Sequence, residues 1–186
     1  MKIVLGGSRH LEFIPGEIGE LLIEWMESSS KFLVGDAPGI DKAFQLFLKS
    51  KKYRDVTVYT SADEIRNNLG NWHVVKVDSG LKSKSSAVHA FKDRKMSQIA
   101  DVGLMIWDCN SAGTLSNVID LLSQGKNCYI WVAPDSDLYQ FDNPASLDKW
   151  MESYPEVRIE AQKRLSAFYK REAKRVSENS QPELFG

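Results

Sequence analysis

The chain has 186 residues, 42% of them hydrophobic and 26% charged, and its formal net charge is −1. This composition is that of an ordinary globular domain with enough apolar area for a core. The near-neutral charge gives no broad basic field, which argues against duplex nucleic acid as a partner.

Strand-like and helical patterns alternate along the first two thirds of the chain. Apolar runs predict strands at residues 2–5, 31–34, 56–59, 102–107 and 127–132, with a short extra strand at 74–77. Apolar residues at spacings of three and four predict helices at about 16–28, 40–49, 85–99 and 114–124. The alternation predicts an α/β fold with a Rossmann-like, mainly parallel sheet flanked by helices.

The composition changes after Pro134. Residues 135–144 are polar and rich in turn formers, and residues 146–153 and 156–176 have helical patterns. We therefore expect a Rossmann-like domain at 1–133, a helical extension at 134–176 and a disordered tail at 177–186. The last helix is strongly charged. The simplest interpretation of its charged residues is a solvated helix face. The alternative is a modest surface for nucleic acid or a partner, formed by Lys163, Arg164, Lys170, Arg171, Lys174 and Arg175.

The loops after strands are where an open parallel sheet binds ligands. The first contains Gly6, Gly7, Ser8 and Arg9. Its glycines permit a close backbone approach to a ligand, and Arg9 can present its planar guanidinium to a phosphate. A tight turn with a surface arginine explains the same residues.

The second loop contains Gly35, Asp36, Gly39 and Asp41. Asp36 can accept hydrogen bonds from ribose hydroxyls or a base amine, and Asp41 can cap the following helix. Turn formation accounts for the glycines about as well.

The third loop runs from Asp108 through Ser111 and Gly113 to Thr114. It follows the most hydrophobic strand and enters a helix, so its hydroxyls and backbone N–H groups form a potential anion site. Simple capping by Ser111 or Thr114 is the alternative.

Three segments, taken together, resemble the SLOG superfamily: GGSR, VGDAPGID and KDRKMSQIADVGLMIWDCNSAGTLSNVIDLLSQGKNCYIWV. This superfamily includes the YspA-like and YpsA-like proteins, the DprA core and the LOG phosphoribohydrolases. The similarity covers roughly residues 1 to 133. It implies a Rossmann-like sheet that binds nucleotides or their derivatives. The phosphate would lie near Ser111, Gly113 and Thr114, in a pocket lined by Gly7, Arg9, Gly35, Asp36, Gly39 and Asp41. No phosphate-binding GxxxxGK[ST] loop and no GxGxxG motif is present.

One departure from the LOG enzymes concerns catalysis. Those enzymes carry PGGxGTxxE, whose glutamate takes part in N-glycosidic cleavage, whereas this chain has CNSAGTLSN. Ser116 or Asn117 occupies the glutamate position, although Arg94 matches the arginine that precedes the motif. Asp108 or Asp36 is a conceivable replacement carboxylate. The candidate catalytic residues are therefore Asp108 and Arg94.

The remaining features set expectations on compartment and partners. Cys109 and Cys128 form no CxxC pair, and no signal peptide or membrane-length apolar run occurs, so we expect a cytoplasmic protein without a membrane partner. The histidines are scattered, so neither a metal nor a cofactor is expected. The tail residues Gln181, Leu184 and Phe185 resemble the peptide by which bacterial proteins bind the DNA polymerase sliding clamp.

Three hypotheses for function follow. The first is a sensor or binding module for a nucleotide-like small molecule, with a homodimer left open. The second is a nucleotide N-glycosidase of phosphoribohydrolase type. The third is a DNA-metabolism adaptor that uses the tail to reach the clamp.

Overall fold

The computed structural model describes residues 1–78 and 86–179. Its elements, in chain order, are β1 (Lys2–Gly7), α1 (Gly16–Glu27), β2 (Lys31–Gly35), α2 (Ile40–Ser50), β3 (Val56–Thr60), β4 (His73–Lys76), α3 (Ser86–Ile99), β5 (Val102–Trp107), α4 (Ala112–Ser123), β6 (Asn127–Val132), β7 (Asp137–Phe141), α5 (Pro144–Trp150), a 3-10 turn (Met151–Ser153) and α6 (Pro155–Asn179).

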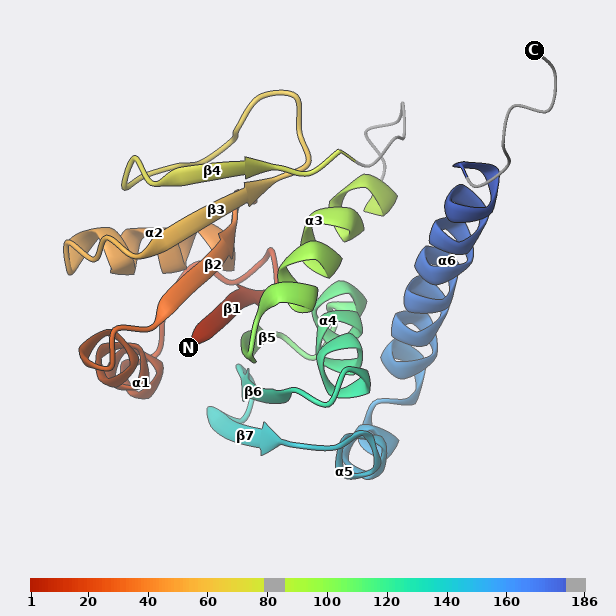
Figure 1. Cartoon of the computed structure of the whole chain (residues 1–186). Coiled ribbons are helices and arrows are strands. Elements are labelled where there is room, and N and C mark those ends of the chain that lie inside the picture. The colour runs from red at the N-terminus through yellow and green to blue at the C-terminus, as the bar shows by residue number, and fades with distance from the viewer. Residues whose placement is uncertain (79–85, 180–186) are drawn as a thin grey trace, which may run out of the picture.

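The strands of the described residues form one seven-stranded sheet in the order β4-β3-β2-β1-β5-β6-β7 (Figure 1). Neighbouring strands are parallel except β6 and β7, which are antiparallel. The chain builds outward from β1 to β4 on one side and from β5 to β7 on the other. This is the predicted Rossmann-like α/β fold, and its topological switch point lies between β1 and β5.

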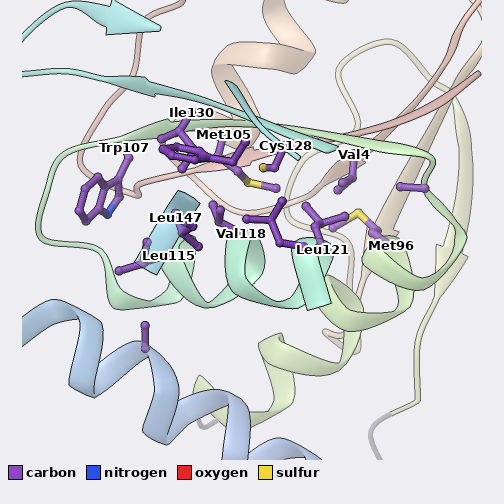
Figure 2. Packing of buried hydrophobic residues seen from close by; sticks show 14 of the residues in the cluster. Val4, Met96, Met105, Trp107, Leu115, Val118, Leu121, Cys128, Ile130 and Leu147 are labelled. Carbon is purple, nitrogen blue, oxygen red and sulfur yellow. The ribbon is translucent and has the colours of Figure 1, made fainter. Parts of the chain in front are cut away.

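The alternation of side chains along each strand divides the core into two layers. In β1, Ile3 and Leu5 pack with α1 and α2, whereas Val4 faces α3 and α4. Figure 2 shows the second layer, where the sheet meets α4. Its labelled residues are Val4, Met96, Met105, Trp107, Leu115, Val118, Leu121, Cys128, Ile130 and Leu147. Helices α5 and α6 pack outside α4, on the side away from α1 and α2 (Figure 1).

Trp107, at the end of β5, connects this core to the loop before α4. Its side chain is fully buried and packs against Trp150 and Tyr154. Its indole N–H donates a hydrogen bond of 3.0 Å to the carbonyl of Ser111. The core therefore fixes the backbone from which α4 begins.

Three local expectations need correction. Residues 137–141 form the edge strand β7 rather than a turn-rich stretch, because they pair with β6 after a tight turn in which Ser136 has a φ of 56°. Gly6 and Gly7 belong to β1 instead of the following loop. Helix α4 begins at Ala112, two residues earlier than predicted, because Ser111 is its N-cap.

The described residues contain no helix that is both long enough and apolar enough to cross a membrane.

Candidate functional site

A cavity lies at the carboxyl ends of β1 and β5, where the strand order of the sheet reverses. It has a volume of about 530 Å³. We call it the cleft. Its walls come from the end of β1, the middle of α3, the loop before α4, the first turns of α4, and α6. The lining residues are Gly7, Arg9, His10, Ala90, Asp93, Arg94, Asp108, Asn110, Ser111, Ala112, Gly113, Thr114, Ser116, Asn117, Glu160, Arg164, Leu165, Ala167, Phe168 and Arg171.

The amino end of α4 forms one wall of the cleft. Ser111 caps the helix, because its Oγ accepts hydrogen bonds from the Thr114 N–H (3.3 Å) and the Thr114 hydroxyl (2.9 Å). Within the described residues, no hydrogen bond satisfies the backbone N–H groups of Ala112 and Gly113. The hydroxyls thus serve the cap, as the capping alternative predicted. The free N–H groups and the helix dipole still offer a place for an anion.

Ser8 and Asp108 join the loops that follow β1 and β5. The fully buried Ser8 donates a hydrogen bond of 2.8 Å to Asp108 Oδ1 and accepts one of 3.1 Å from the Asp108 N–H. The same Oδ1 accepts from the N–H groups of Asn110 (3.0 Å) and Ser111 (2.8 Å). Asp108 lines the cleft, but three donors already hold this oxygen, so its clear role is to shape the loop.

Asp36 binds residues of its own chain. Its buried carboxylate accepts hydrogen bonds from the Thr60 hydroxyl (2.8 Å) and from Arg66, including one of 2.5 Å to Oδ1. Burial disfavours the ionised carboxylate, but the hydrogen bonds from Arg66 and Thr60 outweigh it and lower the pKa of Asp36. Asp36 does not line the cleft, which leaves it no evident role toward a ligand or as a replacement catalytic carboxylate.

A narrow slot of about 50 Å³ opens beside the cleft, and the two share Gly7, Arg9, Asp93 and Asn117 as lining residues. Lys92 lies buried in its wall, 2.9 Å from Asp93 and 3.4 Å from Asp41. Burial alone would lower the pKa of Lys92, but the carboxylates of Asp93 and Asp41 outweigh it and raise the pKa. The slot is thus lined by two cationic side chains, Arg9 and Lys92, and two anionic ones, Asp41 and Asp93, so it offers no excess positive charge to a phosphate.

Ser97 lines the same slot. Its Oγ is buried and finds no hydrogen-bond partner within the described part of the chain. Buried hydroxyls are almost always hydrogen-bonded, so Ser97 Oγ is an exception among the described residues, as is Ser30 Oγ.

Arg94 is buried and fixed against α4. It forms an ion pair of 3.0 Å with the buried Asp120 and donates a hydrogen bond of 3.0 Å to the Ser116 carbonyl. It also donates to the side-chain oxygen of Asn117. Arg94 thus lies at the cleft wall, but its charge is largely neutralised by Asp120.

Three of the glycines singled out in the sequence, Gly7, Gly35 and Gly39, are required by internal packing. A Cβ on Gly7 would lie 2.3 Å from the carbonyl oxygen of Ile106, and a Cβ on Gly35 would lie 2.0 Å from Asp41 Oδ2. Gly39 has a φ of 79° and abuts the backbone of Arg9. These close approaches explain the glycines without a ligand.

The structure brings together the residues predicted in the first and third loops and separates most of the second from them. Arg94 and the predicted ligand-binding residues Gly7, Arg9, Asp108, Ser111, Gly113 and Thr114 line the cleft, whereas Gly6 and Asp41 line only the slot. Ser8, Gly35, Asp36 and Gly39 line neither and hold the loops in place. The predicted clamp-binding residues Gln181, Leu184 and Phe185 lie outside the described residues.

The contribution of α6 is the feature that sequence reasoning missed. Its cleft-facing residues include Glu160, Arg164, Phe168 and Arg171. Their spacing of three and four places them on one helix face. That spacing is readable in the sequence, but the sequence does not say which face of a charged helix meets the rest of the domain.

Comparison with protein-family models, with curated proteins and with solved structures gives no match.

Proposed function

We propose that this protein binds a nucleotide or a nucleotide-derived ligand in the cleft and acts as a sensor or binding module. The observation that carries the proposal is the convergence of an unpaired cation and free N–H groups at the switch point. Arg9 is exposed, lines the cleft and forms no hydrogen bond or ion pair within the described part of the chain. It shares the cleft with the open amino end of α4. Together they match what a phosphate group needs.

The dimensions of the site agree with this proposal. Small-molecule pockets have volumes of about 300–1,000 Å³, and the cleft at about 530 Å³ falls within that range. The adjoining slot, lined by Asp93 and Asn117, offers polar partners for a sugar or base. A ligand with its phosphate at α4 and its sugar or base toward the slot would use both.

Binding is favoured over N-glycosidic cleavage because Ser116 or Asn117, both of which line the cleft, stands where the similar LOG motif has its glutamate. An amide cannot act as the general base or acid of that reaction. The carboxylates that line the cleft already have partners: Asp93 pairs with Lys92, Asp108 holds the loop, and Glu160 pairs with Arg164.

We expect Gly113→Asp to weaken nucleotide binding at least about tenfold, equivalent to about 1.4 kcal/mol. A Cβ at Gly113 meets no atom closer than 3.9 Å, and an acidic residue in the first turn suits the helix dipole, so the fold should be kept. The new carboxylate would repel a phosphate at the same N–H groups. Isothermal titration with the 5′-monophosphates of adenosine, guanosine, cytidine and uridine measures the change.

The matched control is Gly16→Asp. Gly16 is also in the first turn of a helix, and a Cβ there meets nothing within 4 Å, but it lines neither the cleft nor the slot. Its affinity should equal that of the unmodified protein. If a folded Gly113→Asp variant bound nucleotides as tightly as the unmodified protein, the amino end of α4 would not be part of the site. If none of the monophosphates bound to the unmodified protein, the proposed function would be contradicted.

We also expect the protein to release no free base from nucleoside monophosphates. Chromatography of the products after prolonged incubation measures this. Base release by the unmodified protein that disappears in Asp108→Asn would instead establish an enzyme with a relocated carboxylate.

A further inference from the structure

Helix α6 contributes two arginines to the cleft. Arg164 and Arg171 lie on the face that also carries Phe168, and all three line the cleft. The contacts that hold the helix in this position include a hydrogen bond from the Tyr169 hydroxyl to Asp120 on α4 and the edge-to-face packing of Phe168 on Phe91 of α3, with ring centroids 4.9 Å apart. The arginines therefore project from a fixed support.

Arg164 lies beside the amino end of α4. Its Nη1 is 3.9 Å from the position that a Cβ on Gly113 would take. Its Nε donates a hydrogen bond of 2.9 Å to Glu160, which fixes the stem, and among the described residues no hydrogen bond engages its terminal nitrogens, which can contact an anion. Arg164 therefore belongs to the same anion site as the N–H groups of α4.

Arg171 lies at a separate point of the cleft. It follows Arg164 by seven residues, which corresponds to about 10 Å along a helix. Arg171 is exposed and has neither a hydrogen bond nor an ion pair to the described residues. An unpaired guanidinium on the wall of a cavity is suited to a second anionic group of the ligand.

The surface between these two arginines is apolar. Leu165, Ala167 and the buried Phe168 line the cleft there. A continuous chain of phosphates would lie against carbon atoms along this stretch, where it loses hydration without gaining partners. A sugar or base fits it better.

We propose that the cleft recognises a nucleotide with phosphate groups at two separate positions, such as a nucleoside 3′,5′-bisphosphate. One phosphate is held by the amino end of α4 with Arg9 and Arg164, and the other by Arg171. The inference rests on the proposed function and deepens it, because it names the class of nucleotide and makes α6 part of the recognition site.

The test compares the 5′-monophosphate, the 5′-diphosphate and the 3′,5′-bisphosphate of each of the four nucleosides by isothermal titration. In the unmodified protein the bisphosphate of the preferred nucleoside should bind about tenfold more tightly than its monophosphate or its diphosphate. Arg171→Gln should remove most of this advantage, because glutamine keeps part of the aliphatic stem and lacks the charge. Lys170→Gln removes a neighbouring exposed charge that does not line the cleft, and should leave the advantage intact.

The outcomes separate this inference from the proposed function. If monophosphates bind and the bisphosphate is not preferred, this inference is overturned and the proposed function stands. The same follows if the preference for the bisphosphate survives in Arg171→Gln. A diphosphate that binds as tightly as the bisphosphate would show that the phosphates are contiguous, and would also overturn it. Failure of all the nucleotides to bind would remove the proposed function itself. Thermal unfolding confirms that each variant is folded.

Discussion

Replacing Asp120 with alanine is expected to lower the free energy of unfolding by about 3–5 kcal/mol. Asp120 is fully buried, and its carboxylate pairs with Arg94 at 3.0 Å and accepts hydrogen bonds from Gln124 and the Tyr169 hydroxyl. The substitution leaves the guanidinium of Arg94 buried without a counter-charge, which costs far more than the lost attraction alone. Urea unfolding monitored by circular dichroism measures the loss.

The matched control is Asp148→Ala, which breaks the ion pair between Asp148 and Arg158. These groups are also 3.0 Å apart, but their side chains are 51% and 31% exposed. Solvent screens an exposed pair, so the loss should stay below about 1 kcal/mol. Similar losses for the two variants would show that the pair of Arg94 and Asp120 is not desolvated as the structure indicates.

Gly7→Ala is expected to destabilise the fold by about 1–3 kcal/mol through overpacking. The new Cβ would lie 2.3 Å from the carbonyl oxygen of Ile106 and 2.9 Å from a methyl group of Ile40. The first contact is to the backbone of β5, which is held in register with β1 and cannot move without breaking the sheet. Denaturant unfolding again provides the measurement.

Gly16→Ala serves as the control for this variant. A Cβ at Gly16 meets nothing within 4 Å, and alanine is the better helix former at the start of α1. Its stability should be equal to or slightly above that of the unmodified protein. If Gly7→Ala were just as stable, the explanation of Gly7 by internal packing would be wrong, and close approach to a ligand would again be the reason for a glycine there.

The sequence predicted the central architecture because the buried strands have a strong local signature. Val102–Trp107 and Asn127–Val132 are strands with the predicted bounds, since a strand covered on both faces is apolar at almost every position. The edge strand Asp137–Phe141 was missed for the opposite reason. It is short, it is largely exposed or half-buried, and it is defined by its pairing with β6. The Asp and Ser residues around it are equally typical of a loop.

The candidate site was predicted only in part. The third loop was recognised as a helix entry because Ser and Thr just before a helical pattern of apolar residues are local signals. Ser111 is indeed the N-cap of α4. For the second loop, local reasoning could not predict two long-range partners. Arg66, 30 residues further along the chain, donates hydrogen bonds to Asp36, and Lys92 on another helix pairs with Asp41. The partners that satisfy a carboxylate are set by packing, so its availability to a ligand cannot be read from its own neighbours in the sequence.

What the sequence by itself determined is the parallel α/β sheet, the order of its helices and the concentration of polar and glycine residues after β1, β2 and β5. These follow from local periodicity and from turn-forming residues, which depend only on near neighbours. The tertiary structure alone decided that α6 packs on α4 and turns Arg164 and Arg171 toward the cleft. It also decided that Asp36 and Asp120 are used to hold the chain together. The physical reason is that charge and burial are long-range properties: a guanidinium or carboxylate is free or committed according to what the fold places within a few ångströms of it.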